Sequence, residues 1–259
     1  MPDLLTIAPL WYWVVMAALL GLALGSFFTV MAWRWPREES LSTPRSHCTG
    51  CGHVLGPHEL VPVLSWAIQR GRCRGCGARV SARYPAIELA TAALAAIPVA
   101  TFGPTASGLA AALMAVALVP IVVIDLQHRL IPDVIVLPAA AVALALVIAA
   151  DPGRWWQPVV AAAGAAGFLF LLWLFYPGGM GLGDVKLALL MGAVLGTAVI
   201  PALGIAFLTG SLLGVAMLLR HGSAARKMAV PFGPFLAVGA LVALWWGPAM
   251  VGWYADRLG

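Results

Sequence analysis

Charged side chains are scarce in this sequence. Only 10% of its 259 residues are Asp, Glu, Lys or Arg, whereas 62% are hydrophobic. Soluble globular domains contain about 25% charged residues, so this scarcity excludes an ordinary water-soluble domain. Long uncharged runs are present instead, and a membrane-spanning helix needs about 20 mostly apolar residues. The composition therefore predicts an all-α protein that crosses a membrane several times and has the lipid bilayer as a partner.

The sequence also lacks the features typical of nucleic-acid binding. Its isoelectric point near 9.4 is basic, but the Lys and Arg residues lie in loops that flank apolar runs, without interleaved aromatic residues. We therefore expect these residues to face a membrane surface, and we expect no nucleic-acid partner. The N-terminus lacks the basic start of a cleavable signal peptide, and its apolar run from Leu4 to Trp33 is too long for one.

The apolar runs predict about eight transmembrane helices. The uncharged run from Leu187 to Leu219 is too long for one span and is interrupted by Gly196 and Pro201, so we divide it there. The expected spans are 10–31, 86–102, 109–124, 134–150, 158–176, 185–200, 202–219 and 234–253. We expect three parts: a first helix in residues 1–33, a polar insert in 34–85, and a seven-helix membrane domain in 86–259. Gly21 and Gly25 have GxxxG spacing, which we interpret as close helix packing rather than a specific dimer motif.

The distribution of basic residues predicts the orientation of these spans. With the N-terminus outside and eight spans, 13 of the 15 Lys and Arg residues fall on the cytoplasmic side, as the positive-inside rule requires. Seven spans would move Arg220, Arg226 and Lys227 to the outside, so the charges favour eight. We therefore expect a bacterial inner-membrane protein with a periplasmic N-terminus and a cytoplasmic insert.

All four cysteines lie in the insert, as two CxxC pairs: Cys48 with Cys51, and Cys73 with Cys76. The pairs are separated by 21 residues, and each is followed by a glycine that helps a turn to close. Four thiolates on two tight turns suit tetrahedral zinc, and a metal would stabilise an insert too small for a large core. Disulfides are the alternative, but the cytoplasm is reducing. We therefore expect a structural zinc site, with His47 and His53 exposed to solvent.

Three aspartates lie at the predicted ends of spans. Asp125 follows an apolar run at the end of the third span, where the helix dipole is unfavourable for an anion. Asp184 and Asp133 each begin a span and could cap a helix, and we favour that interpretation for Asp133. Glycines before Asp184 permit close approach of another chain. Two carboxylates at one membrane face could act as general acid and base, so Asp125 and Asp184 are candidates for an aspartic peptidase pair.

The order of motifs resembles the bifunctional prepilin peptidases of type IV pilus and type II secretion systems. The similar segments cover nearly the whole chain, and they are Gly25–Phe28, Arg34–Pro36, both CxxC pairs, Pro62–Trp66, Arg70–Cys73, Ser81–Pro85, Glu88, Ile124–Asp125, Ile131–Asp133, Gly181–Asp184 with Lys186, and Pro231–Phe235. No Gly-x-Ser-x-Gly, His-Glu-x-x-His or P-loop motif competes with them.

The resemblance implies an enzyme that cuts the leader of a prepilin or pseudopilin after glycine, on the cytoplasmic side. It implies methylation of the new N-terminus from S-adenosylmethionine, with Asp125 and Asp184 as catalytic residues. Supporting or substrate-binding roles are assigned to Gly181, Gly183, Lys186, Glu88 and Asp133. The insert would correspond to the zinc-bearing domain of the bifunctional members.

Two positions depart from the family pattern. Thr29 stands where the family has Asn, and Glu59-Leu60-Val61-Pro62 stands where the family commonly has Asp-Asn-Ile-Pro. Both lie in the region linked with methylation, so a peptidase without methyltransferase activity is an alternative. A transporter, or a membrane scaffold with a zinc module, is an alternative from another class. The insert carries eight Arg against three acids, and we expect it to face anionic lipid.

Overall fold

The computed structural model describes residues 8–176, 179–222, 228 and 230–258. These residues form helices joined by turns, and they contain no β-strand beyond two isolated bridges. The all-α prediction is confirmed for this part of the chain. The chain forms two compact units, Met1–Pro104 and Thr105–Gly259.

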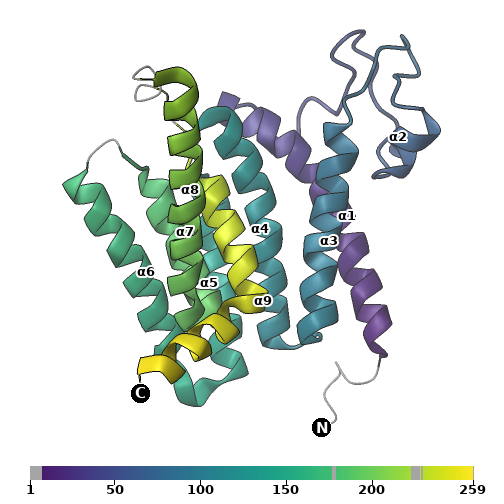
Figure 1. Cartoon of the computed structure of the whole chain (residues 1–259). Coiled ribbons are helices and arrows are strands. Elements are labelled where there is room, and N and C mark those ends of the chain that lie inside the picture. The colour runs from purple at the N-terminus through teal and green to yellow at the C-terminus, as the bar shows by residue number, and fades with distance from the viewer. Residues whose placement is uncertain (1–7, 177–178, 223–227, 229, 259) are drawn as a thin grey trace. The chain divides into compact units, whose positions relative to one another are not determined.

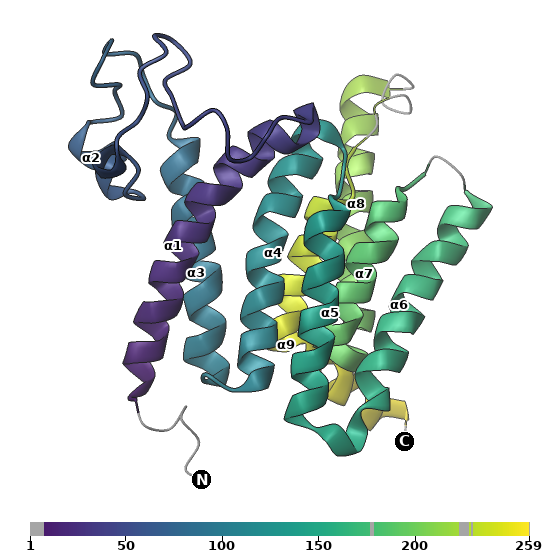
Figure 2. The same ribbon diagram turned by 180° about the vertical axis from the view of Figure 1, so that it is seen from behind.

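The first unit is built on two helices, α1 (Leu10–Arg34) and α3 (Arg83–Phe102), which lie side by side in Figures 1 and 2. A methyl group added at Gly21 would lie 2.6 Å from the Cα atom of Ala92, and one at Gly25 would lie 2.7 Å from that of Glu88. The GxxxG spacing therefore serves packing within the chain, as expected. Because of this contact α3 groups with α1, whereas the sequence suggested that it belongs with the later helices.

The polar insert connects α1 to α3 and contains three short helices, η2 (Trp35–Arg37), η3 (Pro57–Glu59) and α2 (Leu64–Ile68). Its first loop is held by Arg34, a buried residue at the end of α1. The guanidinium group of Arg34 donates to the carbonyl oxygens of Ser40 and Pro44, at 2.9 and 2.7 Å. A buried arginine of this kind fixes the path of the loop, because its charge is stabilised only while those carbonyls stay in place.

The second unit contains six longer helices, which run roughly side by side in Figures 1 and 2. They are α4 (Ala106–His128), α5 (Asp133–Ala150), α6 (Trp156–Phe175), α7 (Leu182–Leu195), α8 (Val199–His221) and α9 (Gly233–Leu258). Local signals set several ends. The Thr105 hydroxyl accepts a hydrogen bond from the Gly108 N–H and caps α4, and Arg129 ends that helix with a left-handed φ of 54°.

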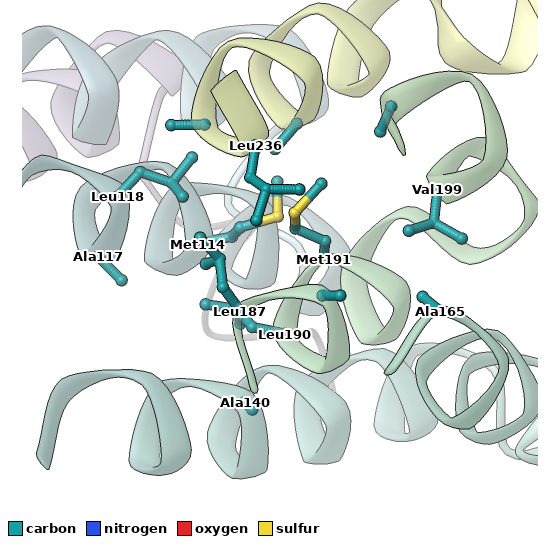
Figure 3. Close-up of a cluster of buried hydrophobic side chains, with 14 of the residues drawn as sticks. Met114, Ala117, Leu118, Ala140, Ala165, Leu187, Leu190, Met191, Val199 and Leu236 are labelled. Atoms are coloured by element: carbon teal, nitrogen blue, oxygen red, sulfur yellow. The ribbon is translucent and has the colours of Figure 1, made fainter. Parts of the chain in front are cut away.

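Helix α7 lies at the centre of this unit and contacts α4, α5, α6, α8 and α9. Met114 of α4, Leu187 and Met191 of α7, and Leu236 of α9 are fully buried and meet in one cluster (Figure 3). Many of the other buried residues are alanines, which let helices approach closely in lipid, where the hydrophobic effect gives no drive. The core therefore fixes α7, the helix that begins just before Asp184, on all sides.

Seven helical runs among the described residues are long and apolar enough to cross a membrane. The longest, Leu182–His221, has 40 residues, twice the length that one span needs. It consists of α7 and α8, joined by the short helix η5 (Gly196–Ala198), and Gly196 ends α7 with a φ of 56°. The predicted interruption at Gly196 is confirmed, whereas Pro201 lies in the first turn of α8, where proline is tolerated. The seven runs therefore comprise eight long helices among the described residues, of which α7, with 14 residues, is shorter than one span needs.

Candidate functional site

Asp125 lies in the last turn of α4, and its side chain is buried with 5% exposure. One carboxylate oxygen, Oδ2, accepts a hydrogen bond of 2.9 Å from the backbone N–H of Gly233, 108 residues later in the chain. Gly233 is the first residue of α9, where backbone N–H groups have no partner within the helix. The positive end of the α9 dipole thus offsets the unfavourable position of Asp125 at the end of α4.

Glycine at position 233 lets the Asp125 carboxylate approach without a displacement. A methyl group added there would lie 2.6 Å from Oδ2 of Asp125, a separation too short for nonbonded carbon and oxygen atoms. Gly233 belongs to the family-like segment Pro231–Phe235, but no role was predicted for it from the sequence. The glycine is followed by Pro234, and proline is favoured at the start of a helix because the N–H it lacks would have no partner there. This pattern could have predicted the start of α9 at Gly233.

Asp184 is the third residue of α7 and is buried with 6% exposure. Its Oδ2 atom accepts a hydrogen bond of 2.9 Å from the N–H of Gly181, the N-cap residue of the same helix. An acidic side chain at this position that reaches back to the N-cap N–H stabilises the helix start. Asp184 thus has a local structural role, although it does not occupy the N-cap position considered from the sequence.

The two aspartates belong to one cluster. Asp125 lies close enough to Asp184 for their charges to interact. Ile131 lies between their flanking glycines: methyl groups added at Gly183 and Gly233 would lie 2.7 Å and 3.4 Å from atoms of its side chain. The close neighbour of Gly183 is thus a side chain of this same chain, and the approach of another chain expected at the glycines before Asp184 stays a prediction. The unit thus brings together two carboxylates that are 59 positions apart in the sequence.

Asp133 forms an ion pair with Lys186 and does not cap its helix. Asp133 is the first residue of α5, the N-cap residue is Pro132, and no side-chain capping bond is present there. Both carboxylate oxygens of Asp133 accept hydrogen bonds of 2.7 Å from Nζ of Lys186, two residues after Asp184. The capping interpretation of Asp133 is therefore wrong. The long Lys186 side chain reaches across from α7, and a capping pattern in the sequence carries no information on such a partner.

Glu88 is buried in the first unit, where it joins the insert to α3. Its Oε2 atom accepts a hydrogen bond of 2.7 Å from the backbone N–H of Val63. Val63 has a positive φ of 61°, an unfavourable conformation for a β-branched residue. The buried carboxylate thus fixes the strained turn before α2. A contact of Glu88 with a substrate, expected from the resemblance, stays a prediction.

The four cysteines lie together in the insert. Their Sγ atoms are all within 4.8 Å of one another, and the pairs Cys48–Cys76 and Cys51–Cys73 are 3.9 Å apart. All four are free thiols. Zinc–sulfur bonds of about 2.3 Å in a tetrahedron place sulfurs about 3.8 Å apart, so the cluster fits one zinc ion.

The two CxxC pairs have the same local structure. In each pair the first cysteine is followed by a tight turn, which ends at a glycine with positive φ, 73° for Gly52 and 70° for Gly77. The amides of these glycines donate to the carbonyls of Cys48 and Cys73, both at 2.9 Å. The role expected for both glycines in closing the turns is confirmed. Neither His47 nor His53 belongs to the sulfur cluster.

Sequence reasoning gave no structural role to Glu59, which lies beside one of these turns. One oxygen of its nearly buried carboxylate accepts hydrogen bonds from the Gly56 N–H at 2.9 Å and from Nε2 of His53 at 3.1 Å. The Gly56 N–H, followed by His53, holds the pKa of the Glu59 carboxyl below its usual value. Glu59 therefore stabilises the loop after the first CxxC pair. The departure from the family pattern at this position has a structural consequence in the insert.

Comparison with known proteins gives a consistent result over the whole chain. Residues 19–102 match the Bacterial Peptidase A24 N-terminal domain, and residues 112–219 match the Type IV leader peptidase family. A protein of Aeromonas salmonicida is 34% identical over 96% of both chains. One of Bacillus subtilis is 36% identical over 90% of this chain and 94% of its own. A protein of Pseudomonas aeruginosa is 35% identical over 99% of this chain and 98% of its own.

All three relatives bear the name prepilin leader peptidase/N-methyltransferase. No solved structure gives a significant match to the chain. The apolar helices and the two domain matches together indicate a protein that crosses the membrane several times. The resemblance found in the sequence motifs is thereby confirmed: this chain belongs to the type IV leader peptidase family.

Proposed function

We propose that this protein is a membrane aspartic endopeptidase that removes the leader of type IV prepilins or pseudopilins, with Asp125 and Asp184 as its catalytic pair. The observation that carries the proposal is the geometry of these two buried carboxylates. They come from different helices, lie close enough for their charges to interact, and each accept a hydrogen bond from one glycine N–H. The names of the relatives support the substrate class and favour an enzyme over a transporter or a scaffold.

The two carboxylates would act as base and acid in peptide hydrolysis. Two close carboxylates share one proton, because both cannot easily be ionised together. The ionised group takes a proton from water, and the oxygen of that water attacks the scissile carbonyl carbon. The protonated group donates its proton to the carbonyl oxygen. When the tetrahedral intermediate collapses, the C–N bond breaks and the leaving nitrogen takes up a proton.

The backbone hydrogen bonds have a role in this mechanism. Each aspartate has one oxygen bound to a glycine N–H, which fixes the orientation of the carboxylate. In each case the bond uses Oδ2, so Oδ1 is the oxygen that would handle the proton or the water. Catalytic groups held by packed helices and backbone donors need little reorganisation during the reaction.

Orientation in the membrane follows from the charges. We propose an inner-membrane location with a periplasmic N-terminus, because 13 of the 15 basic residues then face the cytoplasm. The aspartates would also face the cytoplasm. Arg226 and Lys227, which contribute to this count, lie outside the described residues.

The cysteine cluster supports a zinc site, whereas no described feature of the fold identifies a site for S-adenosylmethionine. Cys48, Cys51, Cys73 and Cys76 would hold zinc, which would supply folding energy to the insert. S-Adenosylmethionine is implied by the family resemblance and by the N-methyltransferase in the names of the relatives. The described residues contain no strand leading to a glycine-rich loop that could hold its nucleoside. We therefore assign methyl transfer to no residue, and we expect it to depend on the end of the first helix and on the insert.

The proposal is tested with the detergent-purified protein, a prepilin and S-adenosylmethionine, by reading the product masses. Asp125→Asn and Asp184→Asn should each lower the cleavage rate by at least about 1000-fold, and the double variant should be scarcely worse, because the pair acts as a unit. Asp151→Asn, which changes an exposed acid paired with Arg154, is the matched control and should cleave normally.

Near-normal cleavage by either single variant, in protein shown to be folded, would rule out the catalytic pair. The same assay tests methylation separately. Asp184→Asn should still methylate a pilin that has already been cut. If neither the parent protein nor any folded variant adds a methyl group to the product, the protein is a peptidase without methyltransferase activity.

A further inference from the structure

The insert contains a pocket of about 450 Å³ between α2 and the start of α3. The residues that line it include Trp66, Gly71 and Ser81 together with three arginines, Arg70, Arg72 and Arg79. Ser81 lies two residues before α3 begins at Arg83. The pocket is therefore close in sequence to the point where the chain enters a predicted membrane span.

The charge of this pocket is unbalanced. Three of its lining residues are arginines, and none is acidic. Among the residues that the structure describes, the guanidinium groups of Arg70, Arg72 and Arg79 form no ion pair. A concave site with three like charges concentrates the electrostatic potential and attracts anions.

The backbone holds the arginines close together without any ligand. Arg72 and Arg79 face each other in an antiparallel bridge across the second CxxC turn. Like charges directly opposite on such a bridge are destabilising. Two backbone hydrogen bonds flank the bridge, from the Cys73 N–H to the Ala78 carbonyl at 2.9 Å and from the Val80 N–H to the Gly71 carbonyl at 2.8 Å, so the repulsion persists in the folded insert.

Hydrogen bonds also hold the part of the pocket that Trp66 and Gly71 line. Gly71 has a φ of 64°, its N–H donates to the Trp66 carbonyl at 2.9 Å, and its carbonyl accepts from the Val80 N–H at 2.8 Å. The indole Nε1 of Trp66 donates to the Val80 carbonyl at 3.1 Å. A methyl group added at Gly71 would lie 2.9 Å from the Trp66 ring. The tryptophan therefore closes one side of a preformed pocket.

We infer that this pocket binds a phosphate group. The planar guanidinium fork of arginine matches phosphate oxygens in a bidentate manner, and it does so better than lysine. S-Adenosylmethionine does not suit the site, because it carries a net positive charge and no phosphate. The position just before α3 favours the phosphate of an anionic lipid headgroup over a soluble phosphate.

The test measures binding to the purified full chain by thermophoresis, with three probes: dihexanoyl-phosphatidylglycerol, dihexanoyl-phosphatidylcholine and inorganic phosphate. Arg72→Gln/Arg79→Gln should weaken phosphatidylglycerol binding at least tenfold. The matched control, Arg45→Gln/Arg74→Gln, removes the same charge from exposed positions of the insert outside the pocket and should change binding less than twofold. Arg72→Lys/Arg79→Lys, which keeps the charge but loses the fork, should lie between these values.

Zinc content and melting temperature equal to those of the parent establish that each variant is folded. If the pocket pair fails that check, Arg70→Gln against Arg74→Gln gives the same comparison, because Arg70 is not part of the bridge. The inference would be overturned if the pocket and control double variants lost phosphatidylglycerol binding equally, or if neither lost it. Equal binding of phosphatidylcholine would also overturn it, by showing that acyl chains alone are bound. Binding of inorganic phosphate that is lost with the pocket pair would support a phosphate site with a soluble ligand.

Discussion

Gly233, a residue without a side chain, lies in direct contact with Asp125 of the proposed catalytic pair. The N–H of Gly233 points at Oδ2 of Asp125, and a methyl group on Gly233 would occupy the space of that oxygen. The glycine therefore acts as a positioning residue. It donates to one carboxylate oxygen and leaves the other free for the proton or the water.

Gly233→Ala should lower the cleavage rate by about 10- to 100-fold, because a displacement of about 1 Å in a catalytic group costs on this scale. The expected change is in kcat more than in KM. Gly252→Ala, in the same helix but with open space around it, is the matched control and should retain full activity. The comparison uses initial rates of prepilin cleavage. Equal rates for both variants would show that the Gly233 contact does not position Asp125.

The residues of the site differ in how well the sequence predicted them. Asp125 and Asp184 stand out because acidic residues at the ends of apolar runs are rare, and such rarity is visible in one sequence. The same signal did not predict the contacts of Gly233 and Ile131 or the ion pair of Asp133 with Lys186. Each depends on which helices pack together, and no local pattern encodes a contact between residues 53 or 108 positions apart.

At the scale of helices, the ion pair between Asp133 and Lys186 ties the start of α5 to the start of α7. The side chains are partly exposed, 56% for Asp133 and 34% for Lys186. Exposed pairs contribute only about 0.2–1 kcal/mol to stability. The pair is therefore better regarded as a restraint on the position of Asp184, two residues earlier in the chain, than as a source of stability.

Asp133→Asn and Lys186→Gln should each lower the cleavage rate by about tenfold or less, with the double variant no worse than either one. That non-additivity separates an ion pair from the helix capping that the sequence suggested for Asp133. If Asp133 acted on its own helix alone, its loss would add to that of Lys186. The measurement is a double-mutant cycle on cleavage rates, with melting temperatures recorded in parallel.

Helix boundaries were predicted to within a few residues where capping or glycine signals exist. The interruption at Gly196 was predicted because a long uncharged run cannot form one span, and the positive φ of Gly196 is its physical cause. By contrast, α4 begins at Ala106 and not near Leu109 as predicted, because the Thr105 side chain caps the helix at this earlier position. The packing of α3 on α1 was not predicted, since apolar helices in lipid have similar composition on all faces.

At the scale of the whole molecule, the insert differs from the described helices in having little apolar core. The described insert has only three short helices, so the sulfur cluster is its principal long-range constraint. We therefore expect one zinc ion per chain. Cys51→Ser and Cys76→Ser should lower zinc occupancy and the yield of folded protein, because structural zinc supplies folding energy directly.

Metal analysis by mass spectrometry checks this prediction on the purified protein. His47→Ala is the matched control, because His47 lies next to Cys48 but outside the sulfur cluster, and it should retain zinc. Active protein without zinc would contradict a structural role for the metal. Removal of zinc by a chelator should lower the melting temperature of the insert before it affects the helices of the second unit.

The shortness of α7 would couple the proposed catalytic pair to the thickness of the host bilayer. A helix of 14 residues extends about 21 Å, whereas the hydrocarbon layer is about 30 Å thick. With the Gly196 end of α7 at one interface, the end near Asp184 lies about 9 Å below the opposite one. Longer acyl chains would bury this end more deeply, and shorter ones would bring it to the headgroups. If the two aspartates are the catalytic pair, hydrophobic mismatch would make acyl-chain length a determinant of how easily a substrate reaches them.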